Sequence, residues 1–133
     1  MPRGEPDDTM NRLTAAVIGS AIEVHRELGP GLLESVYEQA LCVEFGLRAI
    51  AFARQLGIPV RYKGTALGEA RMDLVVDGRL LVELKATEGH TPLHLAQVLS
   101  YLRASGLTLG LLINFNVPWL RQGIRRVVRT RSP

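Results

Sequence analysis

The feature that most constrains the fold of this chain is a pair of apolar segments on either side of an Asp77-Gly78 step. Residues 69–76 and 79–86 are rich in Leu and Val, and an Asp-Gly pair between two such segments is a strong signal for a β-hairpin. Three charged side chains stand out within these strands: Asp73, Glu83 and Lys85. Burying a charge costs several kcal/mol unless it is paired or bound to a metal. The hairpin is therefore the first place to look for a functional site.

The register of this hairpin decides whether its two carboxylates can act together. A two-residue Asp77-Gly78 loop would place Asp73 opposite Val82, on the face away from Glu83. A three-residue loop, for example 76–78, or a β-bulge would place Asp73 on the face of Glu83. We expect one of these devices if the two carboxylates form one site.

Helical and strand patterns along the rest of the chain indicate an α/β domain. Amphipathic periodicity predicts three helices, at residues 11–28, 32–47 and 92–104. Strands are expected, besides the hairpin, at residues 50–55, 60–63, 107–115 and 124–128. The strands before the third helix are joined by short turns, as in hairpins. The third helix then crosses to the nearly continuous apolar run at 107–115. This order implies a mixed sheet of four or five strands flanked by helices.

Glycine, proline and capping residues set the expected boundaries. Thr9 or Asn11 can cap the first helix, and Thr91 with Pro92 opens the third. The first helix is expected to end at Gly29-Pro30-Gly31, and the third at Gly106. Gly57 and Pro59 are expected to separate the two short strands. We expect three parts: a flexible tail at 1–10, one domain at 11–129 and a basic tail at 130–133.

Length and composition narrow the class of protein. A chain of 133 residues favours one domain. The single cysteine, Cys42, excludes an intramolecular disulfide and a zinc site made of cysteines alone. No apolar run reaches the roughly 18 residues that a membrane span needs, and the polar, acidic N-terminus does not resemble a signal peptide. We therefore expect a cytoplasmic protein without a membrane partner.

Charge is distributed unevenly along the chain. Residues 1–88 hold 10 basic and 13 acidic side chains, whereas residues 89–133 hold six Arg and no Asp or Glu. Arginine suits bidentate contact with phosphate, so Arg121, Arg125 and Arg126 are candidates for nucleic-acid binding. The alternatives are a solvated basic surface, or a genome whose base composition favours arginine codons.

The hairpin charges favour one kind of chemistry. Two carboxylates with a backbone carbonyl form a hard-oxygen site suited to Mg²⁺ or Mn²⁺. A lysine on the same sheet face can hold an attacking water or stabilise an oxyanion. The alternative is that Glu83 and Lys85 form an exposed pair on an edge strand.

These residues resemble a known family. Asp73, followed ten residues later by Glu83-x-Lys85 in a hairpin, is similar to the PD-(D/E)xK nuclease superfamily. Gly31-Leu32-Leu33-Glu34-Ser35-Val36-Tyr37 matches the GxxExxY signature of a bacterial family within it, and Gln97 to Tyr101 resembles the QxxxY helix of RecB-like nucleases. The likeness runs from about Ile18 to Val128. Met72 stands where the superfamily's name has proline.

The resemblance implies a restriction-endonuclease-like fold and a role for each matched residue. The implied metal ligands are Glu34, Asp73, Glu83 and the carbonyl of Leu84. The implied catalytic set adds Lys85, with Gln97 facing the site and Tyr101 beside the substrate or bracing Gln97. His25 would orient Glu34 or contact a phosphate. Spacing alone leaves alternatives open: Glu38 in place of Glu34, a simple packing pair for Gln97 and Tyr101, and a core position for His25.

We therefore expect a metal-dependent nuclease that uses Mg²⁺ or Mn²⁺ and cuts DNA more readily than RNA. The alternative is a module of the same fold that binds nucleic acid or a protein partner and cuts poorly. A homodimer would supply the two cuts that a duplex needs. Trp119 is expected to cover an edge of the core, with base stacking as the alternative. Zinc binding by His90 and His94 is disfavoured because Pro92 lies between them.

Overall fold

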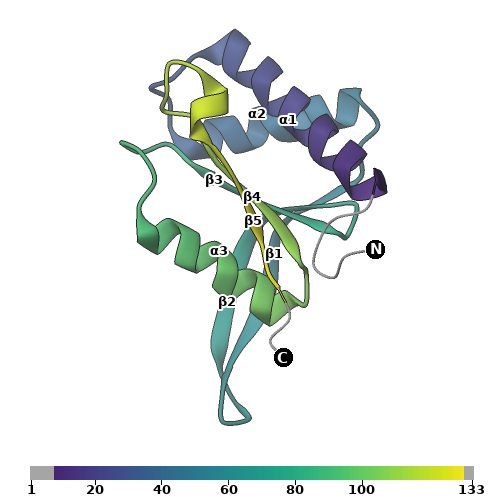
Figure 1. The fold of residues 1–133 in the computed structure, drawn as a ribbon, viewed down its shortest axis with the longest axis vertical. Helices are drawn as coiled ribbons and strands as arrows, with labels where there is room; N and C mark the ends of the chain where they lie inside the picture. Colours follow the sequence, from purple (N-terminus) through teal and green to yellow (C-terminus); the bar gives the residue numbers. More distant parts are fainter. Residues whose placement is uncertain (1–7, 131–133) are drawn as a thin grey trace.

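A five-stranded mixed sheet separates two layers of helices in the computed structural model, which describes residues 8–130 (Figure 1). The strands follow one another across the sheet in chain order: β1 (Phe52–Tyr62), β2 (Thr65–Val76), β3 (Leu80–Lys85), β4 (Leu109–Asn114) and β5 (Ile124–Val128). β3 and β4 are parallel, and the other neighbours are antiparallel. The expected mixed sheet flanked by helices is confirmed.

The helices divide the hydrophobic core in two. α1 (Asp8–Leu28) and α2 (Glu34–Leu47) cover one face of the sheet, and α3 (Pro92–Ser105) covers the other. Tyr37 and Phe45 of α2 are fully buried in the larger cluster, and Val98 and Leu102 of α3 are fully buried in the smaller one. None of the helices within residues 8–130 has the length and apolar character needed to cross a bilayer.

β3 and β4 form the buried centre of the sheet. All six residues of β4 are buried, as the apolar run predicted. α3 makes the crossover that parallel neighbours require, so both strands end at the same edge of the sheet. There Phe115 N–H donates to the carbonyl of Lys85 at 2.9 Å. The buried side chain of Asn114 bonds both the N–H and the carbonyl of Thr87, at 3.2 and 2.8 Å. This edge is fixed from both strands.

The β2–β3 hairpin uses a three-residue loop, one of the two devices that the charge pattern requires. Residues 77–79 connect the paired residues Val76 and Leu80. Asp77 and Gly78 adopt positive φ angles of 55° and 66°, which glycine and aspartate tolerate best. The resulting register places Asp73 level with Glu83, with the loop one residue later than the 76–78 example.

The prediction of two short strands before the hairpin is wrong, because the structure has the single strand β1 across Gly57 and Pro59. β1 lies at the edge of the sheet with β2 as its one neighbour. An edge strand accommodates proline because its outer side needs no ladder hydrogen bonds. Together with the first part of β2 it forms an arm that projects from the body of the molecule (Figure 1).

The helix boundaries agree with the prediction at five ends out of six to within two residues. The side chain of Thr91 accepts from His94 N–H, and Gly106 ends α3 in the left-handed conformation. α1 begins at Asp8, so Thr9 and Asn11 lie inside the helix rather than capping it. The buried side chain of Met10 packs on the core and extends the helix into the predicted tail. The rest of that tail (1–7), like residues 131–133, lies outside the described residues.

Candidate functional site

The candidate site lies at a fork where β2 leaves β3. The backbone ladder between the two strands ends at the Leu74–Val82 pair. Beyond it, side chains replace the ladder: Asp73 N–H donates to Glu83 Oε1, and Leu84 N–H donates to Asp73 Oδ2, both at 2.8 Å. Each carboxylate is therefore anchored by the backbone of the opposite strand and keeps a second oxygen for another partner.

The protonation of this pair follows from its burial. Glu83 is 2% exposed. Burial, followed by the negative charge of Asp73, raises the pKa of Glu83 to about 9. Burial also raises the pKa of Asp73, opposed by the hydrogen bond from Leu84 N–H. Without a cation, Glu83 therefore holds a proton near neutral pH.

A third oxygen faces the same fork. In a β-strand, the N–H and C=O of one residue point to the same side. Leu84 N–H points toward Asp73, so the Leu84 carbonyl also faces the fork, past the end of the ladder. Lys85 uses the other side, where its carbonyl accepts from Phe115.

The donor set at the fork fits a hard divalent cation. It consists of two carboxylates and a carbonyl, the oxygen ligands that Mg²⁺ and Mn²⁺ prefer. Over residues 8–130, no three His, Cys, Asp or Glu side chains are grouped closely enough to hold a metal by themselves. Mg²⁺ commonly keeps several waters and takes only one or two carboxylates, so the fork satisfies this requirement without a third close carboxylate.

α2 carries two glutamates, of which Glu34 lies near the fork charges and Glu38 hydrogen-bonds to β1. Glu34 is half-buried, and its pKa is raised by burial and then by the negative charge of Asp73, while Lys85 lowers it. Glu38 is buried and accepts from Arg54 Nε at 2.6 Å and from Gln55 Nε2 at 2.8 Å. The charge of Glu38 also acts on Asp73, so the two glutamates differ in their hydrogen-bond partners, while both lie within electrostatic range of the fork.

Lys85 lies two residues after Glu83 on β3, so both side chains are on the same sheet face. Its charge acts on Glu34, Asp73 and Glu83. Within the part of the chain that the structure describes, no hydrogen bond or ion pair engages its amine. It lines a cavity of about 500 Å³ with Gln97 and Ser100 of α3. This cation is therefore available to a ligand.

α3 supplies a polar pair over the same sheet face. Gln97 Nε2 donates to Tyr101 Oη at 3.0 Å, and the buried Gln97 Oε1 has no partner among the described residues. Burial and then the charge of Glu83 raise the pKa of Tyr101, so its hydroxyl lies within electrostatic range of the fork. Tyr101 therefore holds the amide nitrogen of Gln97, while the amide oxygen of Gln97 accepts no hydrogen bond from the described residues.

The sequence interpretation considered His94 only as a zinc ligand with His90 and did not place it in the candidate site. His94 lines the cavity that contains Lys85 and Gln97, while its Nδ1 accepts from Thr91 N–H at 3.4 Å. Its spacing to Gln97 and Tyr101 on α3 is the signal that could have revealed it, because residues three and seven apart share a helix face. His90 binds the carbonyl of Gly123 instead, so the two histidines have separate partners.

The four residues expected to contact nucleic acid do not form one surface. His25 is buried with Nε2 bonded to the carbonyl of Val117 at 2.8 Å, and it shares a pocket with Arg121. Arg125 and Arg126 are consecutive on β5, so they point to opposite faces of the sheet. Arg126 donates to Asn11 of α1.

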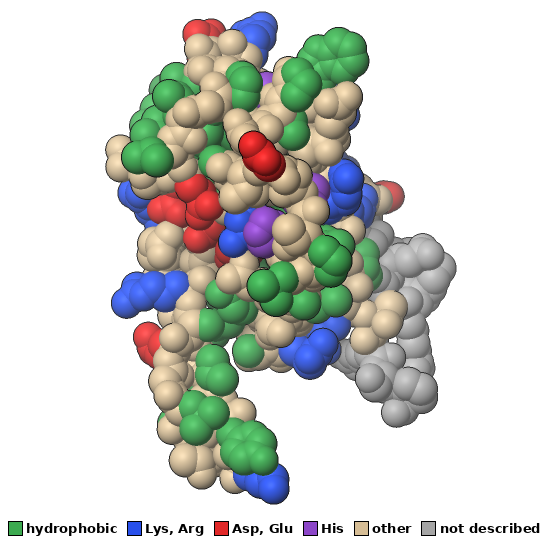
Figure 2. Space-filling model, turned by 90° about the vertical axis from the view of Figure 1, so that its left-hand side faces the viewer, with side chains coloured by type: hydrophobic (Ala, Val, Ile, Leu, Met, Phe, Trp, Pro, Cys, Tyr) green, Lys and Arg blue, Asp and Glu red, His purple; other side chains and the backbone are tan. Residues whose placement is uncertain are grey.

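Figure 2 shows one face of the molecule on which acidic side chains gather beside basic and histidine side chains, above the projecting arm. Apolar side chains border this polar region and extend along the arm. A few charged groups within largely apolar surroundings are typical of ligand-binding sites.

Comparison with known protein families identifies the family of the chain. A family model described as the PD-(D/E)XK nuclease superfamily matches residues 11–127. No curated protein and no solved structure shows significant similarity to the chain. The matched range contains the fork, α3 and nearly the whole sheet, and the observed topology agrees with the restriction-endonuclease-like α/β fold. The chain therefore belongs to the PD-(D/E)XK nuclease superfamily.

Proposed function

We propose that this protein is a divalent-metal-dependent nuclease of the GxxExxY group that hydrolyses phosphodiester bonds, preferring DNA to RNA. The observation that carries the proposal is the fork itself. Two carboxylates, each held by the backbone of the other strand, stand beside a lysine without a partner among residues 8–130. Superfamily membership supports the nuclease class.

Asp73, Glu83 and the Leu84 carbonyl would hold Mg²⁺ or Mn²⁺, with Glu34 completing the set from α2. Such an ion acts as a Lewis acid toward the phosphate and lowers the pKa of an attacking water. The raised pKa values of both hairpin carboxylates support this assignment, because a cation would relieve the burial of their negative charge.

The remaining side chains orient the water and offset charge on the phosphate. Lys85 Nζ donates to the attacking water or to a nonbridging phosphate oxygen, where negative charge grows as the water oxygen bonds to phosphorus. Gln97 Oε1 accepts from that water or from Lys85, while Tyr101 fixes the amide through Nε2. The attacking water gives up a proton to bulk water, the bond from phosphorus to the 3′-oxygen breaks, and the leaving oxygen takes up a proton from bulk water.

Cutting both strands of a duplex with one site per chain requires two binding events or two copies, so a homodimer suits a duplex substrate. Sizing the protein alone and with duplex DNA distinguishes these routes. Co-elution of two chains on one duplex supports the dimer, and one chain per duplex supports sequential cutting.

The test is cleavage of labelled single-stranded, duplex and branched DNA and of RNA, with Mg²⁺, with Mn²⁺ and with EDTA. Asp73→Asn and Lys85→Met should each lower the rate by at least about 100-fold, the effect of removing one stabilising group from an active site. Asp77→Asn is the matched control, because it removes a carboxylate from the same hairpin at an exposed position whose positive φ asparagine tolerates.

Each outcome assigns the function. Metal-dependent cutting that both site variants lose and the control keeps establishes the nuclease. Equal cutting of RNA and DNA would overturn the preference for DNA. A wild-type protein that binds metal and DNA without cutting any substrate would be a nucleic-acid-binding module on a nuclease fold.

A further inference from the structure

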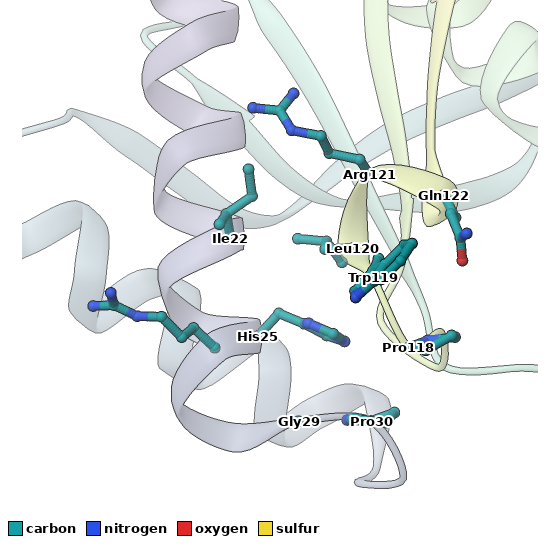
Figure 3. A pocket seen from close by; sticks show the side chains of 10 residues that line it. Ile22, His25, Gly29, Pro30, Pro118, Trp119, Leu120, Arg121 and Gln122 are labelled. Atoms are coloured by element: carbon teal, nitrogen blue, oxygen red, sulfur yellow. The ribbon is translucent and has the colours of Figure 1, made fainter.

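A second pocket lies outside the fork, between the end of α1 and the segment that follows β4 (Figure 3). Its volume is about 560 Å³, within the range of sites for small organic groups. The residues that define it come from both sides: Ile22, His25, Pro30, Trp119, Leu120 and Arg121. In Figure 3, Trp119 and Arg121 lie across the pocket from Ile22 and His25.

The walls of this pocket are held in place by buried contacts. His25 Nε2 bonds the carbonyl of Val117 and so ties α1 to the segment after β4. Phe115, at the base of that segment, stacks on Tyr37 with ring centroids 4.4 Å apart. Tyr37 in turn donates to the carbonyl of Gly29 at 2.5 Å. The pocket is therefore pre-formed, which lowers the entropic cost of binding.

Trp119 is exposed where the sequence suggested that it covers the core. Its side chain is 73% exposed, whereas Leu120 beside it is 4% exposed and belongs to the core. An indole that contributes nothing to the core offers a flat π surface to a ligand. The buried Leu120 anchors this part of the chain to the core, so the indole of Trp119 is not needed for packing and is accessible to a ligand.

The charge of the pocket selects the kind of ligand. None of the described residues that line it is acidic. Arg26 is ion-paired with Glu23, whereas the exposed guanidinium of Arg121 makes no ion pair or hydrogen bond within residues 8–130. An exposed aromatic face and an available guanidinium that line the same pocket complement a planar group attached to an anion, which is the chemistry of a nucleotide.

We propose that this pocket binds an unpaired base of the nucleic-acid substrate, stacked on Trp119, with Arg121 at the adjoining phosphate. The inference rests on the proposed nuclease function and names its substrate class: nucleic acid with a single-stranded segment next to the cut. Bases in an intact duplex are stacked on both faces, so only an unpaired base can present a face to the indole.

Two walls of the pocket lie close in the sequence, or through one hydrogen bond, to residues of the fork. The segment that carries Trp119 starts at Phe115, which donates to the carbonyl of Lys85. The opposite wall ends at the Gly29-Pro30 turn, and α2 begins with Glu34 shortly after it. Both walls therefore continue along the chain into residues near the fork, and the proposal requires one strand of nucleic acid to reach from the pocket to the fork.

The only tryptophan of the chain reports on this pocket. In EDTA, which prevents cutting, oligo(dT) should quench the emission of wild-type protein, and a blunt DNA hairpin of equal length should not. Quenching confined to oligo(dT) supports the proposal. Binding of oligo(dT) detected by anisotropy without quenching would overturn it, as would equal quenching by the blunt hairpin. Emission that shifts on dilution without DNA would show that a second copy covers Trp119, and would also overturn it.

Variants give an independent readout. Trp119→Ala should weaken oligo(dT) binding by roughly 10-fold or more, the effect of one lost stacking contact, whereas Trp119→Phe should stay within a few-fold of wild type. Arg121→Gln should lower the slope of log affinity against log salt by about 0.7, the value for one phosphate contact on a single strand. Unchanged affinity of Trp119→Ala would overturn the proposal.

The two proposals fail differently. Cleavage by wild type with no effect of Trp119→Ala on binding or on the rate would remove the base pocket and leave the nuclease. Quenching by oligo(dT) without metal-dependent cutting would remove the nuclease and leave the pocket as a binding site.

Discussion

Glu83→Gln should stabilise the protein without metal and abolish its activity. Glutamine has the shape of glutamate, and its Oε1 can still accept from Asp73 N–H, the bond seen at 2.8 Å. Its amide can also donate to the Asp73 carboxylate, as a protonated Glu83 does. Glutamine is neutral without taking up a proton on folding and keeps the hydrogen bonds, so the variant avoids the cost of protonating Glu83.

The magnitude follows from the raised pKa. The pKa of Glu83 is about 9 in the folded protein and 4.5 for an exposed glutamate. The folded state therefore binds more protons between these values, so wild-type stability falls as pH rises through this window. Each pH unit costs about 1.4 kcal/mol. At about pH 7 the variant should exceed wild type by roughly 3 kcal/mol, or roughly 10 °C in Tm for a chain of this size.

Urea and thermal unfolding in EDTA, followed by circular dichroism across this pH window, measure the difference. Near pH 4.5 the two proteins should be equally stable, and the gap should widen as pH rises. Glu69→Gln, an exposed glutamate on β2, is the matched control and should leave stability unchanged. A variant less stable than wild type at neutral pH, or a gap that does not depend on pH, would refute the reasoning.

Three further results are expected. Mg²⁺ affinity, measured by calorimetry, should rise by about tenfold per pH unit between about pH 5 and pH 8, because the metal displaces the proton on Glu83; an affinity independent of pH would contradict this. Glu34→Gln should lower the cleavage rate with little change in Tm, whereas Glu38→Gln should lower Tm, since it weakens the buried contacts with Arg54 and Gln55; the reverse pattern would exchange the two roles. Tyr101→Phe should slow cleavage at saturating DNA by about fivefold, the value of one neutral hydrogen bond, and leave stability within about 0.5 kcal/mol; an unchanged rate would remove Tyr101 from the site.

The hairpin and the buried central strand could be predicted because their signals are local. The parity of Asp73 and Glu83 reduced the loop to two options, and the structure uses the three-residue form. The nearly continuous apolar run 107–115 indicated a buried strand, and β4 is buried throughout. In both cases the residues that decide the structure lie close together in the sequence.

The parts that escaped prediction depend on contacts between distant segments. The proposed preference for Glu34 over Glu38 rests on Arg54 and Gln55 of β1, which hydrogen-bond Glu38. The position of β1 at the sheet edge, which lets it run through Pro59, is likewise a property of the strand order. The spacing of residues along α2 does not reveal that β1 supplies partners for Glu38. The sequence around Pro59 does not reveal that β1 lies at the edge of the sheet.

The sequence also could not divide the arginine-rich final third into functional and structural residues. Arg126 is held by Asn11 from the opposite end of the chain, while Arg121 lines the same pocket as the exposed Trp119. Each partner is set by how α1 packs near β5 and the segment after β4. A count of charged residues in the sequence does not distinguish an arginine held by a hydrogen bond from one that lines a pocket.

The most direct measurement of the central claim, that the fork is a metal-dependent catalytic centre, is anomalous diffraction from crystals soaked in Mn²⁺. We predict a peak bounded by Asp73, Glu83 and the Leu84 carbonyl, and its loss in Asp73→Asn crystals. A fork without a peak in wild-type protein that cuts DNA in the same Mn²⁺ buffer would contradict the account, because the catalytic metal would then be bound elsewhere.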